Sequence, residues 1–283
     1  MQISKVGVVS GGAVGYSIAQ VCACAGYHTT LSEVNGLLLT RGLEDIASAL
    51  AGEVKQGKTT EQARQSAINN LHGTTDIRDM KNCDLVIEAL IEHLELKRDV
   101  FVLLDRFCPP RTIFTTNTSF LPIMDVAAAT MRADRTMGTH FPNPATSTKT
   151  VVLKKTIATS KETFADVEAF VKTLSRKPVS ASDELGFLVN TQAVISMLEA
   201  IRLLETGTTT REELDRKTNL GLNQHIGPLR LADLVGLDTL YFAARALGEK
   251  SPDPAYSPPA LLQKLVKDNQ LGHKTGRGFY EYT

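Results

Sequence analysis

The chain has 283 residues, of which 42% are hydrophobic, so it can bury one large core or two smaller ones. It carries 31 basic and 31 acidic residues, and this balance gives no overall field that would attract nucleic acid or an anionic membrane. No apolar run approaches the ~20 residues that span a bilayer, and no basic leader precedes the first apolar segment. We therefore expect a soluble, cytoplasmic protein.

The cysteines do not suggest a metal site. Cys22, Cys24, Cys83 and Cys108 are scattered along the chain, and three of them lie in apolar surroundings. Cys22 and Cys24 are two residues apart, a spacing that points to different faces of a helix. We expect free thiols and no bound metal.

The first two thirds of the chain alternate between strand and helix patterns. Strands are expected at 5–10, 28–34, 83–90, 111–116, 135–140, 150–154 and 179–182, and helices at 14–24, 96–107 and 161–175. Such alternation predicts an α/β domain: a doubly wound, mostly parallel sheet of Rossmann type with helices on both faces.

The segment after the second strand is longer than a simple crossover needs. Leu39, Leu43, Ile46 and Leu50 repeat at helical spacing, and a second helical pattern covers 61–71. Lys55, Gly57 and Lys58 mark a turn between the two. The pattern predicts a helical hairpin inserted into the sheet domain.

Beyond Gly186 the pattern is helical, with helices expected at 187–204, 211–220, 229–247 and 260–268. We place the domain boundary near Asp183-Glu184, giving a nucleotide-binding domain at 1–184 and an all-helical domain at 185–283. The first helix of the second domain is the expected surface of a homodimer.

A glycine turn joins the first strand to the first helix, in the run Ser10-Gly11-Gly12-Ala13-Val14-Gly15. Gly12 would let the backbone approach a pyrophosphate, and Gly15 would allow close helix-strand packing. Gly12, Ala13, Val14 and Gly15 are therefore candidate cofactor-binding residues at the helix N-terminus. Ser10 stands where the usual motif has its first glycine, which removes the most permissive residue from the turn.

Glu33 ends the second strand, 23 residues after Ser10. This is close to the ~20-residue offset of the acid that binds the ribose hydroxyls in such domains. Its carboxylate would repel a 2′-phosphate, so the sequence favours NAD over NADP. Taken alone, Glu33 could equally be a solvated residue at a strand end.

Three further residues could carry proton transfer and substrate binding. His140 ends one strand, Ser119 follows another, and Asn190 begins the helical domain, where it could face the site across a cleft. Histidine suits a base that works near neutral pH, and hydroxyl or amide donors can hold substrate oxygens. Each residue also has a purely structural explanation when considered singly.

An ordered set of runs along nearly the whole chain resembles the 3-hydroxyacyl-CoA dehydrogenases of 3-hydroxybutyryl-CoA type. The matching runs are Asp84–Ala89, Asn117–Ser119, His140-Phe141 with Asn143-Pro144, Phe187–Asn190, Gly227–Leu229, Val235–Asp238 and Lys274–Tyr280. The resemblance implies NAD as cofactor and an L-3-hydroxyacyl thioester as substrate. It also implies that His140 is the general acid/base, with Ser119 and Asn190 assisting.

The resemblance assigns further residues. Ala89, Glu92, Lys97 and Asn117 would belong to the NAD site, and Lys55 and Lys58 on the hairpin would lie near the phosphates of CoA. In the family a glutamate orients the catalytic histidine, whereas Val152 occupies the matching position here. Loss of an orienting acid can lower a rate by on the order of 10⁴-fold in hydrolase triads.

Three accounts of Val152 stay open. Another group or water could orient His140, or the substrate could be unusual, such as a hydroxyacyl group on an acyl carrier protein in a biosynthetic pathway. Alternatively, the protein could be an NAD-binding pseudoenzyme. Retention of Ser119, His140 and Asn190 favours an enzyme of fatty acid metabolism.

Overall fold

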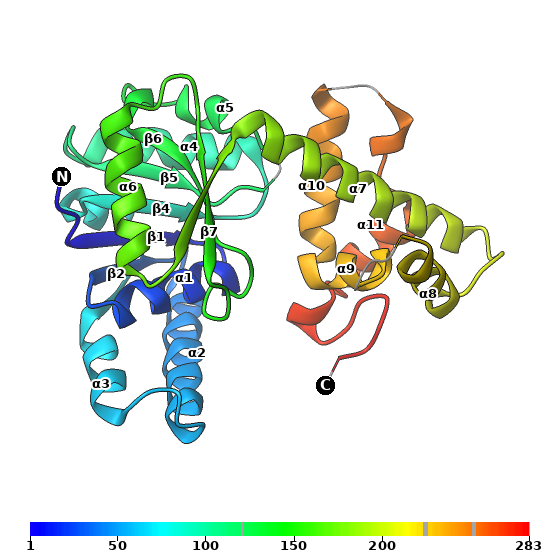
Figure 1. Cartoon of the computed structure of the whole chain (residues 1–283), viewed down its shortest axis with the longest axis horizontal. Coiled ribbons are helices and arrows are strands. Elements are labelled where there is room, and N and C mark those ends of the chain that lie inside the picture. The colour runs from blue at the N-terminus through cyan, green and yellow to red at the C-terminus, as the bar shows by residue number, and fades with distance from the viewer. Residues whose placement is uncertain (120, 223–225, 251–252, 283) are drawn as a thin grey trace. The chain divides into compact units, whose positions relative to one another are not determined.

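The computed structural model describes the chain except residues 120, 223–225, 251–252 and 283, and it leaves the side chains of 182–190, 222 and 250 undescribed. The described chain divides into two compact units, Met1–Gly186 and Phe187–Thr283. The division after Gly186 lies two residues beyond the predicted boundary after residue 184. The first unit is an α/β domain and the second is helical (Figure 1).

The first unit is built on one eight-stranded sheet with the order β3-β2-β1-β4-β5-β6-β7-β8. Its strands are β1 (Lys5–Ser10), β2 (His28–Ser32), β3 (Leu71–Thr74), β4 (Leu85–Ala89), β5 (Ile113–Thr116), β6 (Thr136–His140), β7 (Thr150–Lys155) and β8 (Lys177–Ser182). All neighbouring pairs are parallel except β6 and β7, which are antiparallel. The prediction of a doubly wound, mostly parallel sheet is confirmed.

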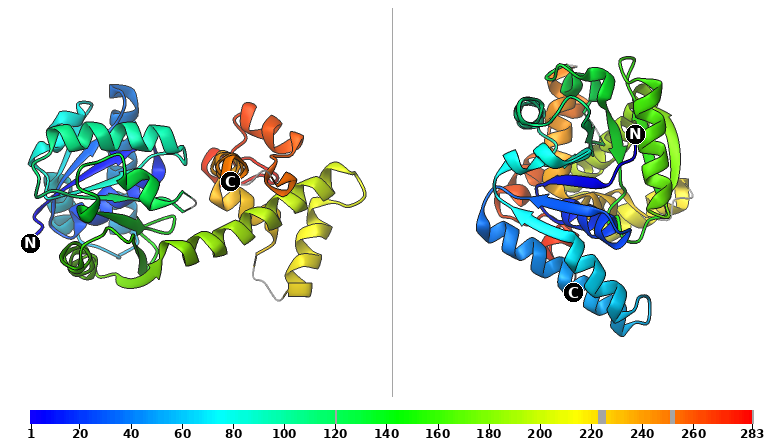
Figure 2. Two further views of the ribbon diagram at one scale, coloured as in Figure 1. Left: turned by 90° about the horizontal axis from the view of Figure 1, so that it is seen from above. Right: turned by 90° about the vertical axis from the view of Figure 1, so that its left-hand side faces the viewer.

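Helices cover both faces of this sheet (Figures 1 and 2). One apolar core joins the sheet to α1 (Ala13–Cys24), α2 (Gly36–Lys55), α3 (Glu61–Asn70) and α6 (Lys161–Thr173). A second core lies against α4 (Leu94–Phe107), α5 (Ile123–Ala127) and the 3₁₀ segment η1 (Ile77–Asn82). Two further 3₁₀ segments, η3 (Pro254–Tyr256) and η4 (His273–Thr275), lie in the second unit, and η2 (Ala133–Arg135) precedes β6.

The inserted helical hairpin is present as α2 and α3, and it projects from the sheet domain (Figure 2). The predicted apolar stripe of α2 faces the core: Ile46 and Leu50 are buried, and Leu39 and Leu43 pack against the same cluster. Sequence reasoning missed β3, because Leu-His-Gly-Thr is short and has no alternation of apolar and polar residues.

The second unit contains α7 (Asp183–Glu205, which starts in the first unit), α8 (Arg211–Leu222), α9 (Pro228–Val235), α10 (Leu237–Lys250) and α11 (Ala260–Lys267). The single helix expected at 229–247 was wrong. It is two helices, divided at Gly236, whose φ of 101° lies outside the helical region.

The C-terminal run 274–280 is anchored to the helices by buried carboxylates. Asp233, on α9, is fully buried and accepts hydrogen bonds from the backbone N–H groups of Phe279 and Tyr280 and from the hydroxyl of Tyr282. Asp215, on α8, accepts from the Tyr280 hydroxyl at 2.9 Å. The resemblance in this run therefore rests on structural residues.

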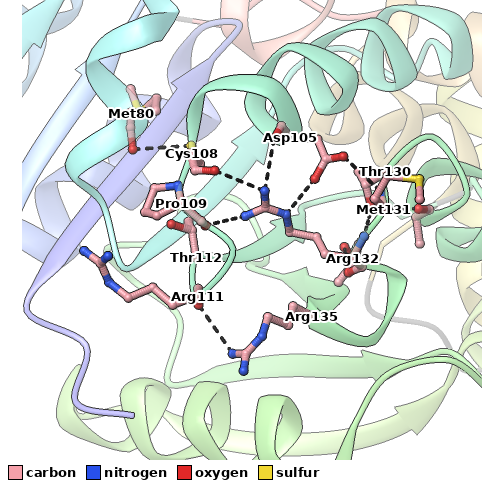
Figure 3. Close-up of polar contacts among 12 residues, drawn as sticks. Met80, Asp105, Cys108, Pro109, Arg111, Thr112, Thr130, Met131, Arg132 and Arg135 are labelled. Carbon is pink, nitrogen blue, oxygen red and sulfur yellow. Dashed lines mark hydrogen bonds and ion pairs between the residues drawn. The ribbon is translucent and has the colours of Figure 1, made fainter.

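Arg132 holds the end of α4, as Figure 3 shows. Its guanidinium donates to the Asp105 carboxylate at 2.6 Å and to the carbonyl oxygens of Asp105, Cys108 and Pro109 at 2.6–3.1 Å. It also lies 4.7 Å from the centroid of the Phe114 ring. Carbonyls at a helix end lack partners within the helix, so this buried fork completes the C-terminus of α4.

Candidate active site

The glycine turn keeps its shape although Ser10 replaces a glycine. The Ser10 hydroxyl donates to the Gly12 carbonyl at 3.2 Å and accepts from the Gly12 N–H at 3.1 Å. Gly12 itself has φ 128°, which favours glycine, and the N–H of Gly11 donates to Ala89 O at 3.2 Å. The serine side chain thus closes the turn with hydrogen bonds.

Gly15 packs directly on this serine. A Cβ atom at Gly15 would lie 2.4 Å from Ser10 Oγ and 2.9 Å from Ser10 Cα, closer than real contacts allow. This is the close helix-strand approach predicted for the last glycine of the motif. Ala13, Val14 and Gly15 form the first turn of α1, whose N-terminus opens onto the turn.

A cavity of about 820 Å³ lies beside the glycine turn. It is lined by 9–12 on β1 and the turn, Tyr16 on α1, 32–34 at the end of β2, Leu38 on α2, 75–78, 90–91 after β4, and the α4 residues Leu96, Val100 and Leu103. Of the predicted cofactor residues, Gly12 and Glu33 line it. This volume lies within the range of sites for small molecules and cofactors.

The Glu33 carboxylate lines this cavity and has one oxygen that is available to accept a hydrogen bond from a hydroxyl group. Its side chain is 3% exposed, and its Oε2 accepts the N–H of Val34 at 3.2 Å. Its Oε1 is buried and has no hydrogen-bond partner in the described part of the chain. Burial and the neighbouring Glu33 carboxylate raise the pKa of Tyr16 to about 12. An acceptor left open beside a glycine turn fits the ribose hydroxyls of NAD.

The other predicted cofactor residues lie at the carboxyl ends of β4 and β5 and in α4. Glu92 is buried; it accepts from the Thr118 hydroxyl at 2.7 Å and from the Ser119 N–H at 2.6 Å. Asn117 accepts the Phe141 N–H at 2.7 Å through Oδ1. These bonds join the loops after β4, β5 and β6, where ligands gather in doubly wound sheets.

Lys97 has no exposed side-chain surface and does not line the cavity. Its Nζ donates to Glu88 Oε1 at 2.6 Å and to the carbonyl of Leu90 at 3.2 Å. The other oxygen of Glu88 accepts from the Thr116 hydroxyl at 2.6 Å. Lys97 therefore supports the loop that bears Leu90 and Ile91, two residues of the cavity wall.

His140 and Ser119 lie together. The Ser119 Oγ is 3.1 Å from His140 Nδ1. His140 ends β6 and Ser119 follows β5, its parallel neighbour, so both side chains lie at the same edge of the sheet. Glu92 fixes the backbone of Ser119 through the N–H bond. The structure thus joins the predicted base to one of its two predicted assistants.

Strand β7 faces His140 without a carboxylate. His140 pairs directly with Val152, and Gly138 pairs with Lys154, in the antiparallel ladder of β6 and β7. Lys154 is 3% exposed. Burial, and then the positive charge of Lys154, lower the pKa of His140 to about 4 from its ordinary 6.5.

Sequence reasoning missed Lys154, although a signal was available. Side chains alternate between the two faces of a strand, so residues 150, 152 and 154 share one face of the predicted strand. If Val152 lies opposite His140, Lys154 must lie on the same face as His140.

Asn190 lies among the residues whose side chains are not described. Lys55 and Lys58 are exposed, at the end of α2 and in the turn before α3, and they do not line the cavity.

The fold and this site define an NAD-binding oxidoreductase with a Rossmann-type domain. Residues 5–184 match the NAD binding domain of 3-hydroxyacyl-CoA dehydrogenase, and residues 186–282 match the C-terminal domain of the same enzyme. The chain belongs to the 3-hydroxyacyl-CoA dehydrogenase family. It is an NAD-dependent oxidoreductase, as the resemblance implied.

Named relatives agree over the full length. A 3-hydroxybutyryl-CoA dehydrogenase of Mycobacterium tuberculosis is 43% identical over 282 residues, covering 99% of both chains. The crystal structure of M. tuberculosis FadB2 matches with a TM-score of 0.88 and 42% identity over 100% of both chains. That of (S)-3-hydroxybutyryl-CoA dehydrogenase from Ralstonia eutropha matches with a TM-score of 0.83 and 37% identity, also over 100% of both.

Among the described residues, no helix is both long and apolar enough to cross a membrane.

Proposed function

We propose that the protein oxidises a short-chain L-3-hydroxyacyl-CoA, or reduces the corresponding 3-oxoacyl-CoA, with His140 as general acid/base. The observation that carries this proposal is the hydrogen bond between Ser119 Oγ and His140 Nδ1, at the sheet edge that also bears the nucleotide loops. The substrate class is supported by relatives that are named 3-hydroxybutyryl-CoA dehydrogenases.

The contact with Ser119 is compatible with the tautomer of His140 that the reaction needs. When Nδ1–H donates to Ser119 Oγ, Nε2 keeps its lone pair and can take the hydroxyl proton of the substrate. Bound NAD supplies the acceptor for the hydride that leaves carbon 3. The Ser119 hydroxyl remains able to donate to a substrate oxygen, because a hydroxyl both accepts and donates.

The remaining residues extend the proposal. Asn190 is assigned to the substrate oxygens, and Lys55 and Lys58 to the phosphates of CoA, on the resemblance alone. Glu33 would hold the ribose, with Gly12 at the pyrophosphate. We also propose a cytoplasmic homodimer that associates through the helical domain.

The test measures NADH oxidation with acetoacetyl-CoA, beside the same acyl group on an acyl carrier protein. We expect turnover, faster with the CoA thioester, and we expect His140→Asn to lower kcat by about 10²–10⁴-fold, the usual contribution of a general acid/base. Faster turnover on the carrier protein would identify a biosynthetic substrate instead. Intact NADH binding without turnover on either thioester would favour a pseudoenzyme.

A further inference from the structure

The ladder between β6 and β7 determines what His140 faces. Partners that lie directly opposite in an antiparallel pair share one face of the sheet, and alternate residues along a strand share it too. His140, Val152 and Lys154 therefore lie on the same face. Lys154 is the diagonal neighbour of His140, and diagonal neighbours are within reach of long side chains.

The packing around Lys154 holds its stem in place. A Cβ atom at Gly138 would lie 3.2 Å from the Cβ of Lys154 and 2.3 Å from Cδ1 of Ile123 on α5. The lysine stem thus lies against the bare backbone of Gly138, on the face that α5 covers. Its neighbour Lys155 lies on the opposite face and is exposed, with its Nζ 5.9 Å from the centroid of the Phe164 ring on α6.

We propose that Lys154 is a positioning residue for His140: its buried side chain extends along the sheet face that bears the imidazole and places a cation beside the general base, while Ser119 holds Nδ1. This inference rests on the proposed role of His140. Among the side chains that the structure describes, the other titratable groups on the packed elements include Glu92, which accepts from Thr118 and Ser119, and Asp125 on α5. Asp183 and Glu184, which follow β8, lie outside the described side chains.

This arrangement gives His140 the surroundings of a neutral base, which needs no acid at position 152. A carboxylate would stabilise the imidazolium, whereas a buried cation opposes it. His140 then starts each oxidation as a neutral base that Ser119 has already oriented. The developing imidazolium is opposed by Lys154, so turnover is expected to be limited by proton transfer.

The direct test is an NMR pH titration of the His140 Cε1–H signal in the whole protein without substrate, assigned with the His140→Asn variant. We expect a midpoint well below 6.5 in the native protein and an upward shift in Lys154→Met, which removes the charge but leaves the imidazole buried. Lys155→Met makes the same change in net charge on the other face and is the matched control, with no shift expected. An unchanged midpoint in Lys154→Met would overturn the inference.

A second variant provides an independent test in case Lys154→Met does not fold. Val152→Glu introduces a carboxylate opposite His140, and we expect it to raise the midpoint, more so when combined with Lys154→Met because the lysine no longer competes for the acid. Equal midpoints in Val152→Glu and in the double variant would count against Lys154. The titration needs no turnover, so an inactive protein with a shifted midpoint would refute the proposed function alone.

Discussion

At the scale of single residues, the neutral state of His140 predicts an unusual pH dependence. Reduction of a 3-oxoacyl thioester needs the imidazolium as proton donor, and with a pKa of about 4 its fraction rises about tenfold for each unit of pH lowered. We expect the reductive kcat to rise steadily from pH 7.5 to 5.5. In the oxidative direction the neutral base is present throughout, so kcat/KM should show no acid limb near 6.5. A limb at 6.5 in steady-state assays would contradict this.

Ser10 and Gly15 form a residue pair whose substitutions should be coupled. Gly15→Ala should weaken NAD binding at least about tenfold, because the new methyl group meets Ser10 Oγ and displaces the turn. Ser10→Gly removes that hydroxyl, and the double variant should regain part of the affinity. Calorimetric titration with NAD measures both. Additive losses in the double variant would show that the contact is not responsible.

The same residues show what the sequence could and could not reveal. The sequence indicated the glycine turn and showed that serine replaces the usual glycine at its first position. The two hydrogen bonds between Ser10 and Gly12 depend on side-chain geometry, which the sequence does not give. The field of Lys154 on His140 depends on register, which the loop between β6 and β7 determines. A single arginine such as Arg132 forms no sequence pattern, because its partners, the Asp105 carboxylate and three backbone carbonyls, lie 23–27 positions away.

At the scale of elements, helices and strands with clear periodicity were predictable, and α2 with its buried stripe is an example. The prediction was wrong where an element is too short or too interrupted to show a hydrophobic period. These places are β3 and the division between α9 and α10 at Gly236. In both cases neighbouring elements, rather than local preference, determine the backbone path.

Arg132 should matter to the stability of α4 and the strands beside it. Arg132→Ala leaves the Asp105 carboxylate and three carbonyls without their donor in a buried setting, so we expect a loss of about 3–5 kcal/mol in the free energy of unfolding. Arg135→Ala is the control, because the guanidinium bond that the described structure shows for Arg135, to Arg111 O at 3.4 Å, is exposed and long (Figure 3). Urea denaturation measures both. Equal losses would refute a special role for Arg132.

At the scale of the whole molecule, NAD binding should raise the free energy of unfolding, because the cofactor binds the folded state. Glu33 Oε1 is buried and has no hydrogen-bond partner among the described residues, and in the proposed site a ribose hydroxyl of NAD would supply one. NAD at 100 times its Kd should add about 2.7 kcal/mol and raise the melting temperature of the first unit by several degrees. NADP should stabilise less, because its 2′-phosphate would meet the Glu33 carboxylate. Scanning calorimetry with Glu33→Gln as comparison tests this, and equal shifts for the two nucleotides would contradict it.

The antiparallel pairing of β6 and β7 also limits how the chain can change over evolution. Deleting one residue from the loop at 141–149 would slip the register, turn Val151 and Leu153 toward His140, and expose the opposite core. Insertions and deletions there are therefore expected to be rare. Point substitutions at 152 and 154 leave the opposite face intact, so the electrostatics around the base can drift one mutation at a time while the scaffold stays fixed.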